Sequence, residues 1–166
     1  MNYIRKKLQN LKENFQRIRL LPVIKQNPPS VNHIADDSNT PRSLQQQGRD
    51  GELFVMQWLA QQGYIILKHS YRTRFGEIDI IASHENLVAF VEVKMRQQNY
   101  FDLSQVITVT KQRKIIKSAY EFIVRHADVC TDRTFRFDVA LLEYVQGQPQ
   151  LRYIPNAFTD TLQHSM

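Results

Sequence analysis

The most informative segment of the chain runs from Gly76 to Lys94 and reads GEIDIIASHENLVAFVEVK. Its two halves are rich in β-branched residues, and the polar stretch 83–86 separates them. This pattern predicts two strands joined by a tight turn, which form a β-hairpin. Side chains alternate between the two faces of a sheet along each strand, so the pairing of the strands determines which charged side chains meet.

Four charged side chains of this hairpin are expected on one face of the sheet. If residues 85 and 86 form a two-residue loop, Asp79 lies directly opposite Glu92. The same register places Glu77 opposite Lys94, where the two opposite charges pair. Like charges that face each other destabilise a sheet, so the facing carboxylates of Asp79 and Glu92 indicate that a positive group belongs between them. A hard divalent cation, held by both carboxylates and by phosphate oxygens of a substrate, fits this gap.

The segments around the hairpin complete an α/β pattern. Helical periodicity predicts a first helix from about Leu44 to Gln62, stopped by Gly63. A second helix is expected to begin at a cap at Ser104 or Thr108 and to end near His126. Further strands are expected at 64–72, 135–141 and 151–154. The order α-β-β-β-α-β, with the last segment as an extra edge strand, predicts a mixed sheet with helices packed against it.

Glu52 is unexpected where it stands in the first helix. It lies in the middle of the apolar stripe formed by Val55, Met56 and Leu59. An unpaired buried charge is costly, so this carboxylate needs a partner, and a metal ion or a lysine would serve. Alternatively, Glu52 lies close enough to the helix N-terminus for the helix dipole to favour it, and it reaches solvent. The residue alone leaves both interpretations open.

The composition is that of a soluble globular protein with one domain and a tail. The chain has 166 residues, of which 42% are hydrophobic. The single cysteine, Cys130, excludes an internal disulfide and disfavours a cysteine-based zinc site. No apolar run is long enough to span a membrane, and the basic N-terminus lacks the apolar core of a secretory signal. The expected location is therefore cytoplasmic.

Positive charge is concentrated at the N-terminus. Residues 1–25 contain seven basic side chains and one acidic side chain, whereas the rest of the chain carries fifteen of each sign. Apolar residues from Ile4 to Ile18 recur at helical spacing, which predicts a basic amphipathic helix. Such a helix packs on the domain or on a second copy, or it contacts nucleic acid, a protein partner or a membrane surface. We divide the chain into this helix with a linker rich in Pro, Ser and Asn (1–43), a domain (44–158) and a C-terminal tail (159–166).

Asp79, followed on the next strand by Glu92-Val93-Lys94, resembles the metal-binding core of the PD-(D/E)xK nuclease superfamily, which has the restriction-endonuclease-like fold. The longer pattern includes Glu52 upstream and FVEVKxR over residues 90–96. It resembles the YraN family of small bacterial endonuclease-like proteins, which are similar to archaeal Holliday junction resolvases. The resemblance covers about residues 48–138. Ser70 and Phe75 stand where that family usually has Asn and Gly.

This resemblance implies metal-assisted hydrolysis of phosphodiester bonds in DNA. Asp79, Glu92, the backbone carbonyl of Val93, and Glu52 would bind Mg²⁺ or Mn²⁺. Lys94 would orient the attacking water or neutralise the scissile phosphate. The catalytic residues implied are thus Asp79, Glu92, Lys94 and Glu52. Without the resemblance, a solvated charge network on one face of the sheet is the slightly favoured explanation of Asp79, Glu92 and Lys94. A fold that hosts nucleases does not by itself establish nuclease activity.

Basic residues after the hairpin are candidates for phosphate contacts, which position nucleic acid without reading its sequence. They are Arg96, Lys111, Arg113, Lys114 and Lys117. Two functions from different classes remain. The first is a DNA endonuclease that acts on branched DNA in repair or recombination or cleaves without structural preference, and a resolvase would also need a homodimer. The second is a noncatalytic module that retains the fold and binds nucleic acid or protein.

Overall fold

The structure is a computed structural model that describes residues 24–26, 44–96, 107–146 and 148–160. The predicted amphipathic helix, most of the linker and the last six residues of the tail lie outside the described residues. The elements, in chain order, are β1 (Ile24–Gln26), α2 (Leu44–Gln61), β2 (Ile65–Thr73), β3 (Gly76–His84), β4 (Leu87–Arg96), α4 (Val109–Arg125), α5 (Ala127–Cys130), β5 (Thr134–Val145) and β6 (Gln148–Phe158).

Five strands, β2 to β6, form a mixed sheet, and the short strand β1 adds to its edge in the order β1-β6-β5-β4-β3-β2. Strands β4 and β5 pair in parallel, and every other pair of neighbours is antiparallel. The α/β class and the predicted order of elements are confirmed. The last strand, expected over only four residues, extends over eleven. Strand β1 lies within the range predicted as linker.

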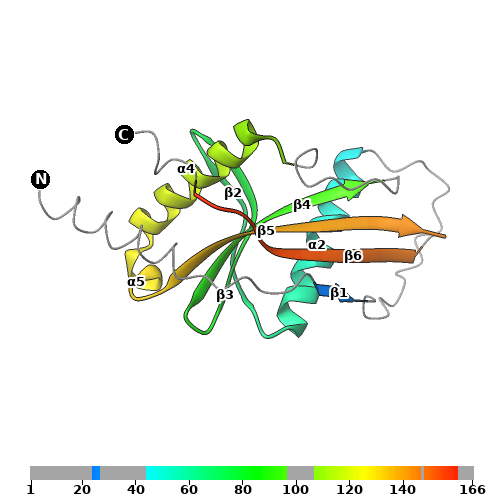
Figure 1. Cartoon of the computed structure of the whole chain (residues 1–166), viewed down its shortest axis with the longest axis horizontal. Coiled ribbons are helices and arrows are strands. Elements are labelled where there is room, and N and C mark those ends of the chain that lie inside the picture. Colours follow the sequence, from blue (N-terminus) through cyan, green and yellow to red (C-terminus); the bar gives the residue numbers. More distant parts are fainter. Residues whose placement is uncertain (1–23, 27–43, 97–106, 147, 161–166) are drawn as a thin grey trace, which may run out of the picture.

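Helices cover both faces of the sheet, and each face has its own apolar core (Figure 1). On one side, Ile116 and Phe122 of α4 pack against Phe90 of β4. On the other, Val55 and Leu59 of α2 pack with residues of β3 and β4. The sheet is therefore the middle layer of three.

The helix boundaries follow from residues at their ends. Helix α2 stops at Gln61, and Gly63 then adopts a φ of +85°, a conformation that favours glycine. Helix α4 begins after Thr108, whose side chain accepts a hydrogen bond from the backbone N–H of Lys111. Both boundaries agree with the prediction to within about one residue. None of the helices among the described residues combines the length and the apolar character that crossing a bilayer requires.

The hairpin has the predicted register. Pairing runs from His84↔Leu87, next to the two-residue turn, to Ile80↔Val91. Pairing between β3 and β4 ends there. Asp79 and Glu92, which come next in the register, therefore do not form a pair in the sheet. The candidate site therefore lies where these two strands separate.

Both strands of the β2–β3 pair exchange faces at the same point. In β3, Ile80 packs in the core on the α2 side, whereas Ile78 packs in the core on the α4 side. In β2, His69 contacts α2, whereas Tyr71 packs on the α4 side. Residues two apart share a face in a regular strand, so the alternation is interrupted in both strands. The interruption falls at Asp79 and, in β2, at Ser70, whose φ is +48°.

Candidate active site

Asp79 occupies the point where β3 leaves β4. One of its carboxylate oxygens, Oδ2, accepts a hydrogen bond of 2.7 Å from the backbone N–H of Val93. Burial and, after it, the charge of Glu92 raise the pKa of Asp79 to about 7, against the opposing effects of the Val93 N–H and the charge of Lys111. A carboxyl group with this pKa is poised between its neutral and charged forms near neutral pH, and a cation would favour the charged form.

Glu92 is almost completely buried, with 1% of its side chain exposed. Its oxygen Oε1 accepts one hydrogen bond of 2.6 Å from Lys94 Nζ and forms an ion pair with Lys111 Nζ at 2.9 Å. Its other oxygen, Oε2, is buried and has no hydrogen-bond partner among the described residues. Buried polar atoms are normally hydrogen-bonded, so this oxygen needs an explanation. A bound cation would provide one, and the two carboxylates of Asp79 and Glu92 fit such an ion.

Two lysines from different elements neutralise Glu92. Lys94 comes from β4 and Lys111 from α4, and their side chains are 35% and 34% exposed. The sequence suggested a phosphate contact for Lys111, and the structure places its ammonium group on the buried carboxylate. The predicted pairing of Glu77 with Lys94 is wrong. Glu77 lies 3.3 Å from the guanidinium group of Arg72, and Lys94 contacts Glu92 of its own strand.

Glu52, on α2, faces the edge strand β2. Its oxygen Oε2 lies 2.7 Å from His69 Nε2 and accepts a hydrogen bond of 3.2 Å from Ser70 Oγ. Glu52 therefore has a histidine and a serine as partners, where the sequence suggested a metal ion or a lysine, or a position at the helix N-terminus that reaches solvent. Its side chain is 20% exposed. The charge of Glu52 also raises the pKa of Asp79, although it is the weakest of the causes.

The carboxylates do not form a closed cage. Among the residues that the structure describes, no three His, Cys, Asp or Glu side chains are grouped closely enough to hold a metal ion. Mg²⁺ commonly uses only one or two carboxylates and completes its shell with waters and substrate phosphates. Asp79 and Glu92 match that kind of open site. The proposed roles of Glu52 and of the Val93 carbonyl as ligands stay predictions.

Comparison with known proteins identifies the family. The pattern that defines the "Uncharacterised protein family UPF0102" matches residues 51–142, which include Glu52, Asp79, Glu92 and Lys111. The chain belongs to the UPF0102 family. The predicted membership of the YraN family is thereby confirmed, since this is the same family. The match spans α2 to β5, so it contains every element that contributes to the site.

UPF0102 relatives align over most of their own length. A UPF0102 protein of Synechococcus sp. (strain JA-3-3Ab) is 39% identical over 123 residues, which are 73% of this chain and 91% of the relative. A UPF0102 protein of Clostridium botulinum is 39% identical over 114 residues, or 67% of this chain and 92% of the relative. One of Geobacter metallireducens is 38% identical over 114 residues, or 67% and 90%. The family match itself, residues 51–142, lies within the range predicted as the domain.

Three of the remaining basic candidates make no ion pair with the buried carboxylates of this UPF0102 domain. Arg113, Lys114 and Lys117 are exposed on α4. Lys114 packs closely against the turn of the β2–β3 hairpin, where a Cβ added to Gly76 would lie 3.3 Å from Lys114 Cβ. Arg96 is the last residue of β4, and its side chain lies outside the described residues.

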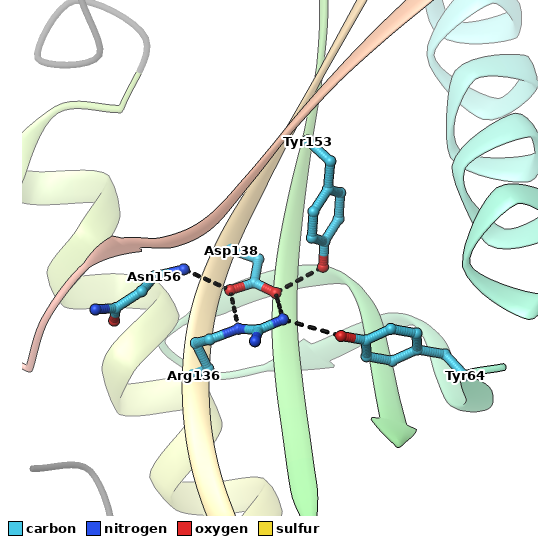
Figure 2. Close-up of polar contacts among 5 residues, drawn as sticks. All are labelled: Tyr64, Arg136, Asp138, Tyr153 and Asn156. Atoms are coloured by element: carbon cyan, nitrogen blue, oxygen red, sulfur yellow. Dashed lines mark hydrogen bonds and ion pairs between the residues drawn. The ribbon is translucent and has the colours of Figure 1, made fainter. Parts of the chain in front are cut away.

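A buried polar network close to the sheet centre was not predicted (Figure 2). Asp138 of β5 accepts two hydrogen bonds of 2.7 Å from Arg136, one of 2.6 Å from Tyr153 Oη and one of 2.9 Å from the backbone N–H of Asn156. Arg136 also donates to Tyr64 Oη at 3.0 Å. Burial and the neighbouring Asp138 raise the pKa of Tyr153 well above its usual value. The network ties β5 and β6 to the residue that precedes β2, which indicates a structural role.

Proposed function

We propose that this UPF0102 protein is a metal-dependent nuclease of the PD-(D/E)xK type that hydrolyses phosphodiester bonds in DNA. The observation that carries the proposal is the convergence of Asp79, Glu92 and two lysines where β3 and β4 separate. The unpaired Oε2 of Glu92 and the raised pKa of Asp79 support a cation between the two carboxylates. Carboxylates with perturbed pKa values beside cationic groups are typical of sites that carry out chemistry.

Each residue of the site has a role that follows from its position. Asp79 and Glu92 would hold Mg²⁺ or Mn²⁺, which when bound supplies a water that is nucleophilic at neutral pH and stabilises charge in the transition state. Lys94, partly exposed, neutralises the scissile phosphate or orients the attacking water. Lys111 holds the Glu92 carboxylate from the α4 side and limits its rotation. Glu52 keeps His69 and Ser70 in place beside the site.

One observation favours a second candidate, a noncatalytic module that binds nucleic acid. Oε1 of Glu92 is already in contact with two ammonium groups, so the fold compensates most of the buried charge without a metal ion. A chain that had lost the reaction would keep this arrangement for stability alone. The two candidates differ in whether the protein cleaves DNA and whether that cleavage requires Asp79.

Cleavage of labelled DNA tests the proposal. Single-stranded, duplex, flap and four-way-junction DNAs are incubated with the full chain in Mg²⁺, in Mn²⁺ and in EDTA. We expect cleavage that requires the metal and is abolished in Asp79→Asn. The matched control is Asp128→Asn, which removes an exposed carboxylate of α5 and should cleave as the natural protein does.

The outcomes separate the candidates. Equal cleavage by Asp79→Asn and the natural protein overturns the assignment of the site. Absence of cleavage on all four DNAs, together with equal DNA binding by both proteins, favours the noncatalytic module. A preference among the four DNAs would indicate whether the substrate is branched.

A further inference from the structure

A groove distinct from the two carboxylates lies between the turn of the β2–β3 hairpin and helix α4. It has a volume of about 780 Å³. The side chains that matter for its chemistry are Arg72, Arg74, Phe75, Lys117, Glu121 and Arg125. We call it the hairpin groove. It joins segments about forty residues apart in the sequence, which come together because α4 packs along the hairpin (Figure 1).

The hairpin groove is positively charged. It has four basic side chains and one acidic side chain, Glu121, which Arg125 neutralises at 2.8 Å. Arg72 lies beside Glu77 on the outer side of the turn. Arg74 and Lys117 are exposed and have no carboxylate partner among the described residues. Unpaired cations that line a concave surface attract an anionic ligand.

Both of these cations lie over an aromatic ring. Phe75 is half-buried at the turn, with the Arg74 guanidinium carbon 4.8 Å and Lys117 Nζ 5.8 Å from the centre of its ring. Stacking platforms flanked by basic groups are how proteins hold single-stranded nucleic acid, because a base stacks on the ring while the cations contact the backbone. A base within a duplex has both faces covered and cannot use such a ring.

The hairpin groove is within reach of the candidate active site along two elements. From Lys111 to Lys117 is six residues of α4, or about 9 Å along the helix axis. From Asp79 to Phe75 is four residues, or about 13 Å along an extended strand. A hydrogen bond of 2.8 Å between Thr73 Oγ1 and Ser118 Oγ fixes the turn against α4. Either path, along α4 or along β3, corresponds in length to a few nucleotides of a single strand.

We propose that the hairpin groove binds a single-stranded segment of DNA, with a base stacked on Phe75 and the adjacent phosphates bound by Arg74 and Lys117. This strand is the part of the substrate next to the cleaved bond, and in that respect the inference rests on the proposed function. Binding itself requires neither the metal nor cleavage. The charge of the hairpin groove and its aromatic ring together favour nucleic acid over an acidic protein surface.

Binding is measured by fluorescence anisotropy with the full chain, a labelled oligothymidylate and a duplex of the same length, in EDTA so that no cleavage occurs. We expect Phe75→Leu to weaken binding of the single strand by about tenfold and to leave the duplex unaffected. Phe75→Tyr, which keeps the ring, should bind as the natural protein does. The basic N-terminal tail is present in every variant and does not affect the comparison.

The cations are tested by salt dependence. Lys117→Ala removes one phosphate contact, so the slope of log affinity against log salt concentration should fall by about 0.7 for the single strand. Arg49→Ala, an exposed arginine of α2, is the matched control and should leave the slope unchanged. If thermal melting shows that Phe75→Leu is unfolded, Arg74→Ala and Lys117→Ala decide the question.

Two results overturn the inference. One is an unchanged single-strand affinity in folded Phe75→Leu together with an unchanged slope in Lys117→Ala. The other is an equal loss in Arg49→Ala, which would mean that any positive charge suffices. Failure of the proposed function is distinguishable, because it appears as absent cleavage in Mg²⁺ while binding at the hairpin groove in EDTA persists.

Discussion

At the scale of single residues, the Asp79 carboxyl couples the candidate site to the stability of the fold. Burial and the neighbouring Glu92 raise its pKa to about 7, whereas an aspartate in the unfolded chain has a pKa of about 3.9. Between these values the folded state binds more protons than the unfolded state. The free energy of unfolding therefore falls as pH rises from about 4 to 7, because in this range the carboxyl is ionised in the unfolded chain while folded Asp79 still holds its proton.

The first prediction is that Asp79→Asn stabilises the metal-free protein above neutral pH. An asparagine oxygen can still accept the hydrogen bond from the Val93 N–H, and the amide does not ionise. We expect a melting temperature at pH 8 higher by about 4 °C, corresponding to about 1 kcal/mol. The difference from the natural protein should narrow toward pH 5, as measured by thermal melting across this range.

A metal titration completes this experiment. Mn²⁺ should raise the melting temperature of the natural protein and leave that of Asp79→Asn unchanged, since ligand binding to the folded state stabilises it. A stability difference that stays constant from pH 5 to pH 8 would show that another group titrates.

Ser70 carries a backbone conformation that serine rarely adopts. Its φ is +48°, where side chains other than those of Gly and Asn are strained, and its hydroxyl donates to Glu52. The second prediction is that Ser70→Asn preserves or raises stability, by up to about 1 kcal/mol, because asparagine tolerates this region. Ser70→Val should cost about 1–3 kcal/mol. Urea unfolding measures both, and equal losses in the two variants would contradict the explanation.

At the scale of elements, the hairpin shows what the sequence could and could not predict. The two-residue turn and the alternation of apolar residues determined the register of β3 and β4, and the structure has that register. The exchange of faces at Ser70 and Asp79 was not predictable, because it depends on one backbone angle and on how α2 and α4 pack on opposite faces. For the same reason, the pairing of Glu77 with Lys94 was mispredicted, and the contact of Lys111 with Glu92 was missed.

Strand β5 gives a second example. Its sequence alternates apolar residues with Arg136 and Asp138, a pattern that usually indicates one face in solvent. In the structure both charged side chains are buried, at 3% and 0% exposure, because they neutralise each other beneath α2. A buried ion pair and a solvent-exposed one give the same alternation of apolar and charged residues in the sequence. Periodicity alone therefore cannot distinguish them.

The third prediction concerns this pair. Asp138→Leu alone leaves a buried guanidinium without its carboxylate and should destabilise the protein by about 3–5 kcal/mol. The double variant Arg136→Met/Asp138→Leu removes both charges and should recover most of that loss. Denaturant unfolding of the single and double variants tests the coupling. If the double variant is no more stable than Asp138→Leu alone, the buried pair is not the unit that stabilises β5.

At the scale of the whole molecule, one edge of the sheet is covered, among the described residues, by a strand of three residues. Strand β1 pairs with Leu151, Arg152 and Tyr153 of β6, which is otherwise the last strand of the sheet on that side. Exposed strand edges pair with other chains. This feature was hidden in the sequence, because a three-residue strand among prolines and polar residues has no periodicity of its own.

The fourth prediction is that removing β1 promotes self-association. A variant that lacks residues 1–27 exposes the edge of β6, and light scattering should show a mass that rises with protein concentration. A variant that lacks residues 1–21 keeps β1 and should behave as the full chain does. If both truncations behave alike, the short strand does not protect the edge.

The burial of Glu92 has a consequence for how such a protein changes during evolution. Loss of this carboxylate would leave the Lys94 and Lys111 ammonium groups, which now share one oxygen, facing each other without compensation. A lineage that no longer needed the reaction would still be selected to keep the glutamate, because the fold depends on it. A descendant that keeps Glu92 therefore shows only that it still folds. Because the charge of Asp79 opposes folding, keeping Asp79 is what would indicate that the descendant still carries out the reaction.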